Sequence, residues 1–525
     1  MSQATGSEAR ETRRKLLHRL DRQRTLVAAG YVGALSGAVA VGFRLLVEHS
    51  EGLGRSTAAA LTHLGPLGYV VLMALGATLG ALAGLLTDRI APDAGGSGIP
   101  QTKAAIMGMR GLRPWRLVLV KIVGGCAALT AGMSLGREGP TIHLGAAMGE
   151  LFGRLGRVPA RSKRVLVAAG GGAGLAAAFN APLAGFLFVM EELRREMSPL
   201  TYGTSLISSV LAVGVARFAL GGASSFALES APQLPLSNLP AVLLVGIAAG
   251  FVGVAFNRAL LATSGFRIRR TIPRWIAGAT VGAFTALLLV AWPEVTGGGH
   301  AVAQRVLQGG MVAPTVAAVA ALFVGKFVTT VLSYATGVPG GLFAPLLVIG
   351  SLVGLCVGLM LQPNPLLAVS PPLLATVGMA AVLASSVRAP LTGVVLIMEM
   401  SGQYSLLYDL LVAAFAAYTV AELLRDTPIY EALLERDLHG GALRSEHEGE
   451  VVEAFVETGS RLDGARIGSL RLPDNVTIAS IEREGRTLAP RGGTTVRPGD
   501  HLTFVVGAEG PAENALVLID ATRAP

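Results

Sequence analysis

Charged residues are scarce in this sequence. Asp, Glu, Lys and Arg make up 15% of its 525 residues, whereas about a quarter is usual in soluble proteins. Aromatic residues are also few, at 5%, while hydrophobic residues reach 52% and the mean hydropathy is +0.58. A disordered chain would be rich in charge, and a soluble domain would be less apolar. The sequence therefore predicts a membrane protein.

Cysteine is nearly absent, and so are the motifs of several protein classes. Cys126 and Cys356 both lie inside apolar stretches with no metal-ligand spacing around them, so we expect them to pack as small apolar side chains. No Walker-type phosphate loop, nucleophile elbow or "TVGYG"-type filter occurs, which argues against hydrolysis and against a potassium path. We expect no enzymatic activity, no resident cofactor or metal ion, and no nucleic-acid partner.

Long apolar runs are what the sequence has in abundance. They lie near 26–47, 68–88, 116–135, 164–190, 203–220, 238–265, 272–292, 314–334, 341–361, 372–400 and 406–424. Several are long enough to cross a bilayer, which takes about 20 helical residues. The sequence thus predicts an all-α polytopic protein of the cell membrane.

The N-terminal segment is basic, with seven Lys and Arg in the first 24 residues. The apolar run after it is too long for the core of a signal peptide, and the positive-inside rule places the N-terminus in the cytoplasm. Residues 1–25 are expected to form a basic cytoplasmic helix at the membrane surface, or to fix the orientation by charge alone.

The composition changes near residue 437. After a polar linker at 437–448, the segments "EVVEAFVET", "NVTIASIERE", "GRTLAP" and "HLTFVVGA" look like strands, with "RGG" and "RPGD" as turns. Residues 449–525 are therefore predicted to form a small soluble domain after the last membrane helix. The membrane domain is expected to span 26–436.

Two halves of the membrane part, about 26–220 and 238–424, repeat one plan. "NAPLAGFLFVMEE" (180–192) matches "RAPLTGVVLIMEM" (388–400) at an offset of 208, and "GREGPTIHLG" (136–145) matches the segment starting at Gly341 at an offset of 205. Repeated halves with Gly- and Pro-interrupted apolar segments are typical of transporters, in which the site lies where broken helices meet.

The breaks occur at "GGSGIP" (95–100), "GREGP" (136–140) and "GGLFAP" (340–345), each followed by a helical pattern. A helix start has free backbone N–H groups and a partial positive charge, so it attracts anions. Three such starts predict an anion site formed largely by backbone N–H groups.

These motifs, in this order and spacing, resemble the three signatures of the CLC family of chloride channels and chloride/proton antiporters, over about residues 26 to 436. The resemblance implies the CLC fold, with two inverted repeats and broken helices, and a homodimer in which each subunit has its own pore. It also implies chloride/proton exchange, with a passive voltage- or pH-gated chloride channel as the alternative.

The resemblance assigns the central chloride to the hydroxyls of Ser97 and Tyr430 and to the backbone N–H groups of Leu342 and Phe343. A serine at position 97 favours chloride. Arg137 and Gly139 are counted with this chloride-binding set, although we expect the Arg137 side chain to be held by backbone carbonyls or water. The supporting positions are Lys121, Gly96, Gly98, Pro100, Gly136, Pro140, Gly341 and Pro345.

Glutamates supply the proton chemistry that the resemblance implies. Glu138 matches the gating glutamate, whose carboxylate takes an anion position and leaves when protonated. Glu192 matches the internal proton carrier, and Glu191 a second acid near the proton entrance. Glu192 can alternatively be a solvated helix-end acid. Lys121 is expected to attract anions, or else to reach an interface with its ammonium group.

The C-terminal segment is similar to the TrkA-C (RCK-C) domain, best at "GARIGSLRLP", "ASIEREG" and "TVRPGDHLTFVVG". The resemblance implies a small α/β cytoplasmic module; in potassium-transport proteins such modules often dimerise, and some bind cyclic di-AMP at the dimer interface. Nucleotide regulation through Asn475 and Arg483 is therefore one hypothesis, and passive dimerisation is the other. A ligand sensor merely anchored by its membrane part is a further alternative, against which the intact motifs argue. The protein is expected in a bacterial inner membrane, with both termini on the cytoplasmic side.

Overall fold

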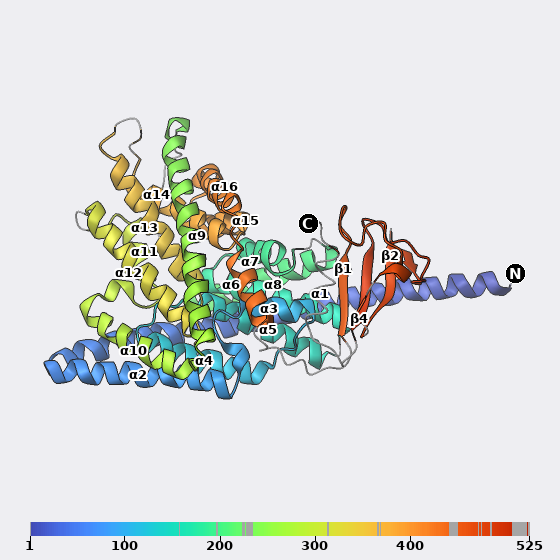
Figure 1. Ribbon diagram of the computed structural model, residues 1–525, viewed down its shortest axis with the longest axis horizontal. Coiled ribbons are helices and arrows are strands. Elements are labelled where there is room, and N and C mark those ends of the chain that lie inside the picture. Colours follow the sequence, from blue (N-terminus) through green and yellow to red (C-terminus); the bar gives the residue numbers. More distant parts are fainter. Residues whose placement is uncertain are drawn as a thin grey trace. The chain divides into compact units, whose positions relative to one another are not determined.

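The computed structural model describes residues 2–156, 158–195, 198–222, 226, 235–311, 314–364, 367, 369–439, 450–470, 472–473, 475–483, 486–506 and 522. It divides into two compact units. The first comprises Met1–Thr102 and Leu112–Ala432, and the second comprises Lys103–Gly111 and Leu433–Pro525. The first unit is helical, and the second carries the only sheet among the described residues (Figure 1).

The helices follow one another along the chain, and two of them, α3 and α17, begin in the first unit and end in the second. Their bounds are α1 (Ser2–Thr62), α2 (Pro66–Arg89), α3 (Ile99–Met107), α4 (Pro114–Thr130), α5 (Glu138–Leu155), α6 (Ala160–Phe179), α7 (Pro182–Phe188), α8 (Pro199–Leu220), α9 (Leu239–Arg269), α10 (Arg274–Ala291), α11 (His300–Leu307), α12 (Val316–Ala335), α13 (Phe343–Leu361), α14 (Pro371–Ser386), α15 (Pro390–Ser401), α16 (Leu407–Leu423) and α17 (Ile429–His439). Short 3-10 turns lie at Pro92–Ala94, Leu236–Asn238, Pro293–Val295, Tyr404–Leu406 and Ile467–Ser469, and a π-helical turn lies at Val189–Leu193.

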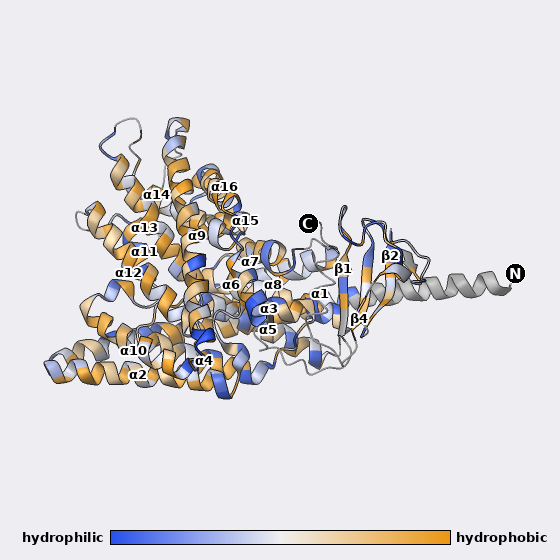
Figure 2. Cartoon of the chain, in the orientation of Figure 1, coloured by the Kyte–Doolittle hydropathy of each residue, from blue (hydrophilic) through white to orange (hydrophobic). Residues whose placement is uncertain are grey.

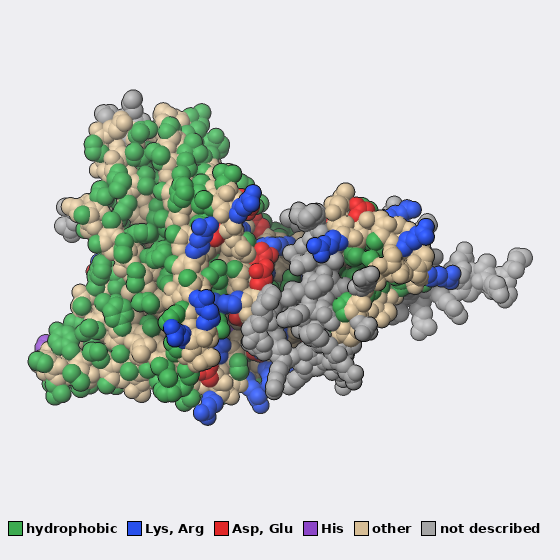
Figure 3. All heavy atoms as spheres, viewed as in Figure 1, with side chains coloured by type: hydrophobic (Ala, Val, Ile, Leu, Met, Phe, Trp, Pro, Cys, Tyr) green, Lys and Arg blue, Asp and Glu red, His purple; other side chains and the backbone are tan. Residues whose placement is uncertain are grey.

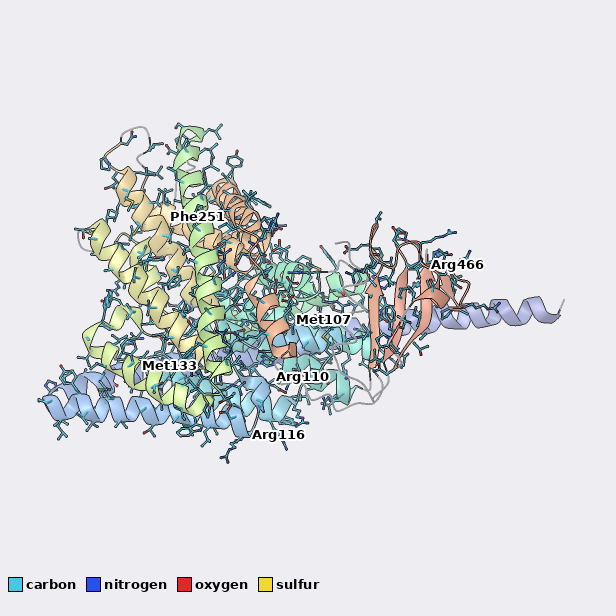
Figure 4. The ribbon with its side chains drawn as sticks, in the orientation of Figure 1. Met107, Arg110, Arg116, Met133, Phe251 and Arg466 are labelled. Carbon is cyan, nitrogen blue, oxygen red and sulfur yellow. The ribbon has the colours of Figure 1, made fainter. Side chains whose placement is uncertain are left out.

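Eight helices among the described residues are long and apolar enough to cross a membrane. They lie at Arg22–Thr62, Pro66–Arg89, Pro199–Leu220, Leu236–Arg269, Arg274–Ala291, Val316–Ala335, Phe343–Leu361 and Tyr404–Leu423. Hydrophobic residues predominate along α2, α9, α10 and α13 (Figure 2), and apolar side chains cover most of the visible face of the first unit (Figure 3). Phe251 on α9, labelled in Figure 4, is 56% exposed. Such a surface suits lipid rather than water.

Two apolar runs that look continuous in the sequence are broken in the structure. The run 164–190 is divided between α6 and α7, and the run 372–400 between α14 and α15. Asn180 (φ 58°) and Arg388 (φ 67°) adopt left-handed backbone angles at the breaks, and a proline begins the helix after each one. Proline is favoured at the first position of a helix and disfavoured in its interior, which explains both breaks.

The N-terminal region also differs from the separate basic helix that the sequence predicted. The basic residues and the first apolar run belong to one helix, α1. No strong helix breaker separates the two segments in the sequence, so the helix continues through both.

Glycines bring equivalent helices of the two halves into close contact. In α5, a Cβ on Gly145 would lie 2.1 Å from the carbonyl oxygen of Gly170 in α6; in α13, a Cβ on Gly350 would lie 2.4 Å from that of Gly378 in α14. Gly145 and Gly350 are paired in the repeat at its offset of 205. The two halves therefore use the same packing device, as the repeat predicts.

The second unit contains all four predicted strands: β1 (Glu450–Phe455), β2 (Val476–Arg483), β3 (Arg486–Leu488) and β4 (His501–Val506). They form an antiparallel sheet in the order β1-β4-β2-β3. The register of β2 shifts between Ile478 and Ser480, so buried residues fall at Val476 and Ile478 and then at Ile481. A bulge moves the alternation by one residue. Of the linker predicted at 437–448, residues 437–439 belong instead to α17, and the rest lies outside the described residues.

Candidate functional site

The two strongest motifs of the sequence meet through their backbones. Gly136 donates its N–H to the carbonyl of Gly341 (2.8 Å), and Gly341 donates to the carbonyl of Gly136 (2.7 Å). These glycines are partners in the internal repeat, and α5 and α13 begin two residues after them, at Glu138 and Phe343. The predicted helix starts are thus confirmed, and a symmetric pair of hydrogen bonds holds two of them together.

The third motif joins the same backbone network. Gly96 donates to the carbonyl of Val338 (3.1 Å) and accepts from the N–H of Gly340 (3.0 Å), and α3 begins at Ile99. Gly139 lies against this junction, because a Cβ there would be 2.8 Å from the Cβ of Ser97. Three helix starts, from "GGSGIP", "GREGP" and "GGLFAP", are therefore connected without side chains, as an anion site built on backbone N–H groups requires.

Ser97 is fully buried at the start of α3. Its Oγ accepts from the N–H of Ile99 (3.3 Å), and the hydroxyl of Tyr334 donates to the same Oγ (3.3 Å). The N–H of Ser97 donates to the Tyr334 hydroxyl oxygen (3.3 Å). Because Ser97 Oγ accepts both bonds, its own proton remains available to another acceptor. Sequence reasoning missed Tyr334, which lies 237 residues from Ser97 along the chain.

Tyr430 is also fully buried, near the start of α17. Its ring is stacked on that of Phe343, with centroids 6.2 Å apart and planes at 18°. Its hydroxyl has no hydrogen-bond partner among the described residues, and the residue lies within electrostatic range of Tyr334, Glu192 and Glu138. A buried hydroxyl without a hydrogen-bond partner costs free energy, so this group is suited to binding a ligand that accepts a hydrogen bond from it.

Leu342 and Phe343 form the start of α13, with side chains at most 1% exposed. Phe343 also packs edge-on against Phe188 of α7, with centroids 5.6 Å apart. The first N–H groups of a helix have no intrahelical acceptors, and Pro345 has no N–H at all. The structure thus presents backbone donors here within an aromatic enclosure.

Glu138 is the first residue of α5 and is 0% exposed. Its Oε1 lies 3.0 Å from Nε2 of His300 and 3.9 Å from Nε of Arg137. Its Oε2 lies beside Gly136 and has no hydrogen-bond partner in the part of the chain that the structure describes. A carboxylate in this apolar environment is only half satisfied by protein groups.

Among the described residues, the Arg137 guanidinium donates to a carboxylate and not to the backbone carbonyls that were one of its two expected partners. Its Nη1 donates to Oε1 of Glu48 in α1 (2.8 Å), which also accepts from Arg44 (2.8 Å). Glu48 sits 89 residues away in sequence, and nothing in the motif indicates it. The arginine therefore links the start of α5 to α1.

Glu192 is completely buried in the π-helical turn after α7, a type of turn that is frequent at functional sites. Arg195 places Nη2 at 3.8 Å from Oε2 of Glu192 and at 3.3 Å from Oε2 of Glu431, the residue after Tyr430. The alternative of a solvated helix-end acid is wrong for the described structure, because the carboxylate is not exposed.

Glu191, the neighbouring acid, serves as a helix cap. Its carboxylate accepts hydrogen bonds from the backbone N–H groups of Leu391 (3.1 Å) and Thr392 (2.6 Å) at the start of α15. Its repeat partner Glu399 does the same at the start of α7, accepting from Leu183 (3.1 Å) and Ala184 (2.9 Å). Each half of the repeat thus caps a helix of the other half.

Two buried lysines hold the loops that precede short helices. Lys121 is 0% exposed and donates to the carbonyl of Gly96 (2.7 Å), so the alternative that it reaches an interface is wrong. Lys326, which is 205 residues further on, is 0% exposed and donates to the carbonyl of Gly297 (2.7 Å). The loop at 297–299, which precedes α11, is therefore the counterpart of the "GGSG" loop, and sequence reasoning missed it.

In the second unit, Arg483 forms a bidentate pair with Asp500, with Nε and Nη2 each 2.7 Å from a carboxylate oxygen, and Nη2 also donates to Thr495 (2.8 Å). Asp500 is 0% exposed. Burial raises the pKa of this carboxyl, but the hydrogen bonds from Arg483 and from the Arg497 N–H outweigh burial and hold the pKa below its ordinary value. Arg483 thus has a role in the fold itself. Asn475 lies immediately before β2.

No cluster of three or more His, Cys, Asp or Glu residues that could hold a metal ion occurs among the described residues. The arrangement instead offers buried hydroxyls, backbone donors at helix starts and two buried carboxylates. These groups are suited to binding a small anion and to carrying protons.

Comparison with known proteins agrees with this geometry. The family model described as "Voltage gated chloride channel" matches residues 79–422, and the TrkA-C domain model matches residues 451–512. A protein of Vibrio parahaemolyticus named H(+)/Cl(-) exchange transporter ClcA is 37% identical over 430 residues, covering 80% of this chain and 91% of that protein. A Vibrio cholerae protein of the same name is 39% identical over 380 residues, covering 71% of this chain and 81% of that protein.

Among solved structures, that of a slow cyanobacterial Cl−/H+ antiporter matches with a TM-score of 0.74 and 34% identity, covering 81% of this chain and 99% of the other. A eukaryotic CLC transporter shares the fold, with a TM-score of 0.66 at 22% identity over 80% of this chain and 74% of the other. The chain therefore belongs to the CLC family of voltage-gated chloride channels and related transporters, and it carries a TrkA-C domain after the family's membrane part.

Proposed function

We propose that this protein exchanges chloride for protons across the membrane. The observation that carries the proposal is the position of Glu138: its carboxylate is fully buried at the first turn of α5, directly after the bridge that joins α5 to α13. Two relatives that share 37% and 39% identity with the chain are named H(+)/Cl(-) exchange transporters, which supports the same activity here.

In this proposal chloride binds between Ser97 and Tyr430. The Tyr430 hydroxyl, unpaired within the described structure, donates to the ion, and Ser97 donates the proton that its contact with Tyr334 leaves available. Backbone N–H groups of Leu342 and Phe343 supply the remaining donors. Neutral donors and partial helix charges attract an anion without holding it as tightly as a full positive charge would.

Glu138 couples the two ions because its carboxylate and chloride compete for the same donors. When a proton binds the carboxylate, the side chain becomes neutral and loses its attraction to the helix starts, so chloride can take its place. When the proton leaves, the carboxylate returns and the chloride is expelled. Arg137 and Gly139 contribute to the shape of this region rather than to proton transfer.

Glu192 is proposed to carry protons between the solution on the other side and Glu138. Its burial in the π-helical turn, and its electrostatic proximity to Tyr430, support this role. Glu191 remains a candidate for the proton entrance, although both of its oxygens already cap α15.

Proton movement in liposomes tests the proposal. Purified protein is reconstituted with a chloride gradient and no pH gradient, and uphill proton flow that disappears in Glu138→Gln is expected. Glu192→Gln should retain chloride flux and lose proton flux. Chloride flux without any proton flux in the unmodified protein would instead establish a passive channel gated by Glu138.

We also propose that the protein is a homodimer in a bacterial inner membrane, with both termini in the cytoplasm. Multi-angle light scattering in detergent tests the assembly. Labelling of single cysteines placed near each terminus, in intact cells and in lysed cells, tests the orientation; labelling in intact cells by an impermeant reagent would contradict it.

Regulation by cyclic di-AMP at the TrkA-C domain is retained as a second hypothesis, with passive dimerisation as its alternative. The match of residues 451–512 to the TrkA-C domain supports either one. Isothermal titration of the full-length protein with cyclic di-AMP tests it, with Asn475→Ala and Arg483→Ala as variants. Absence of heat at saturating nucleotide would reject it.

A further inference from the structure

The nearest polar partner of the Glu138 carboxylate is an imidazole that the sequence motifs do not include. His300 begins α11, and its Nε2 lies 3.0 Å from Oε1 of Glu138. The histidine side chain is 33% exposed, whereas the glutamate is 0% exposed. His300 is therefore accessible to water on one side and in contact with the buried carboxylate on the other.

The loop before His300 is fixed from two sides. The N–H of Gly298 donates to Oε1 of Glu51 in α1 (3.0 Å), and the ammonium of Lys326 in α12 donates to the carbonyl of Gly297 (2.7 Å). Gly299 has φ +80°, and a Cβ there would lie 2.8 Å from Val348. A side chain does not fit at position 299, directly before His300, and the loop is held by both hydrogen bonds. The contact between His300 and Glu138 is therefore a built feature and not a chance approach of a mobile side chain.

Other charged groups around the pair are already matched with partners. Arg137, 3.9 Å from Glu138, donates to Glu48. Lys326 donates to three backbone carbonyls, those of Val295, Thr296 and Gly297. This leaves the imidazole, which can exist as a neutral ring or as an imidazolium, as the polar group nearest to the carboxylate.

His300 also lines a cavity of about 160 Å³ whose charged walls are Glu51, Arg55, Glu294 and Arg305. Arg305 lies 3.7 Å from Glu294, and Arg55 lies 3.4 Å from Glu51. The remaining face of the ring meets Phe226, with centroids 6.1 Å apart. The cavity has room for water, so protons can reach the imidazole from this side.

We propose that His300 is a positioning residue that retains the ionised Glu138 carboxylate in the position seen here, and that the protonation of its imidazole sets the pH range in which the carboxylate is released. The inference rests on the proposed gating role of Glu138. The imidazolium form attracts the carboxylate and opposes its protonation. The neutral ring offers one hydrogen bond without the charge.

The sign of the effect follows from this competition. An opposite charge within a few ångströms favours the ionised form of a carboxyl group, and the usual effect is one unit or more of pKa. Removing the imidazole should therefore allow Glu138 to bind a proton at higher pH. The pH midpoint for Glu138 protonation, and for chloride flux that depends on it, should therefore rise.

Three substitutions separate charge from shape. His300→Phe removes both the charge and the hydrogen bond, His300→Gln keeps a neutral donor, and His300→Lys keeps a positive charge at all accessible pH values. We expect the midpoint to rise most in His300→Phe, less in His300→Gln and not at all in His300→Lys. A purely structural role would rank the variants by size and fit, and so would not give this order.

Protonation of Glu138 is measured in the full-length protein by the infrared band of its carboxylic acid, identified by its loss in Glu138→Gln. Chloride efflux from liposomes at equal pH on both sides is the second readout. Size-exclusion chromatography checks folding, and His300→Gln is the variant least disruptive in shape if His300→Phe fails to fold.

The two proposals fail in different ways. If Glu138→Gln removes the pH dependence of flux but the three His300 variants all keep the wild-type midpoint, or all shift it equally, the inference about His300 is wrong. If Glu138→Gln retains pH-dependent, proton-coupled flux, the gating role itself is wrong. In the Glu138→Gln background no His300 substitution should change the pH profile.

Discussion

Glu191 and Glu399 are related by the internal repeat, and each caps a helix of the other half. Glu191, in the turn directly after α7, accepts from the N–H groups that begin α15, and Glu399, in α15, accepts from those that begin α7. An acidic cap satisfies free N–H groups and complements the partial positive charge of the helix start. The exchange ties the two halves together next to the turn that holds Glu192.

Replacing either cap should destabilise the protein by a similar amount. Glu191→Ala and Glu399→Ala are each expected to lose about 1–2 kcal/mol, which for a protein of this size lowers Tm by a few degrees. Thermal unfolding in detergent measures the effect. A large loss in one variant beside none in the other would contradict the symmetric role, and proton flux in Glu191→Ala would show whether that residue has a second function.

Tyr334→Phe should weaken chloride binding. The substitution removes the hydroxyl that donates to Ser97 and leaves the ring in place. One neutral hydrogen bond contributes about 1 kcal/mol, so the affinity should fall by about fivefold. Isothermal titration with chloride measures it. Tyr404→Phe, at a residue that is 68% exposed, is the control, and an equal loss there would point to a nonspecific effect.

The two buried lysines should have separable effects. Lys326→Met removes the donor that holds the loop before His300, so we expect the pH midpoint of chloride flux to rise, as in His300→Phe. Lys121→Met releases the loop that carries Ser97 and should lower chloride affinity with little change in the midpoint. Identical behaviour of both variants would contradict the assignment of each lysine to its own loop.

Gly98→Ala should prevent folding. Gly98 has φ +87°, and a Cβ there would lie 2.1 Å from the ring of His143. Backbone strain and overpacking together cost about 3 kcal/mol or more. Gly214→Ala, in α8 with nothing within 4 Å of the added Cβ, is the matched control and should be tolerated. Yield and monodispersity after purification report the difference.

The Arg483–Asp500 pair should give the TrkA-C domain an acid-sensitive stability. Because the folded-state pKa of Asp500 is lowered, its contribution is present above the ordinary pKa near 4 and is lost as pH falls from there through the folded-state value. Asp500→Asn should cost about 2–3 kcal/mol at pH 7 and almost nothing in strong acid. Hydrogen exchange of β2 and β4, compared between variant and wild type at each pH, measures this; a difference that does not vary with pH would contradict it.

Local sequence patterns predicted much of the fold. The three Gly- and Pro-containing motifs gave the starts of α3, α5 and α13, and alternation with turn residues gave all four strands. These features depend on residues that are neighbours in the chain. The breaks at Asn180 and Arg388 were missed, although a proline follows each of them by two residues.

Long-range pairs were not predictable in the same way. His300 and Glu138 are 162 residues apart, and Tyr334 and Ser97 are 237 apart; only the packing of the helices brings them together. The partner of Arg137 was missed because Glu48 lies 89 residues away in sequence, on a long helix without a motif. One signal for the His300 loop was present, since Lys326 follows Lys121 at the offset of the repeat.

The reciprocal bonds between Gly136 and Gly341 constrain how transport can work. In many transporters with inverted repeats, one half rocks against the other to expose the site alternately. Here the halves are joined at the site itself by main-chain hydrogen bonds shielded from water, so any hinge located there would have to break both in every cycle. We therefore expect the seam to stay closed while ions pass beside it, with movement confined to individual side chains.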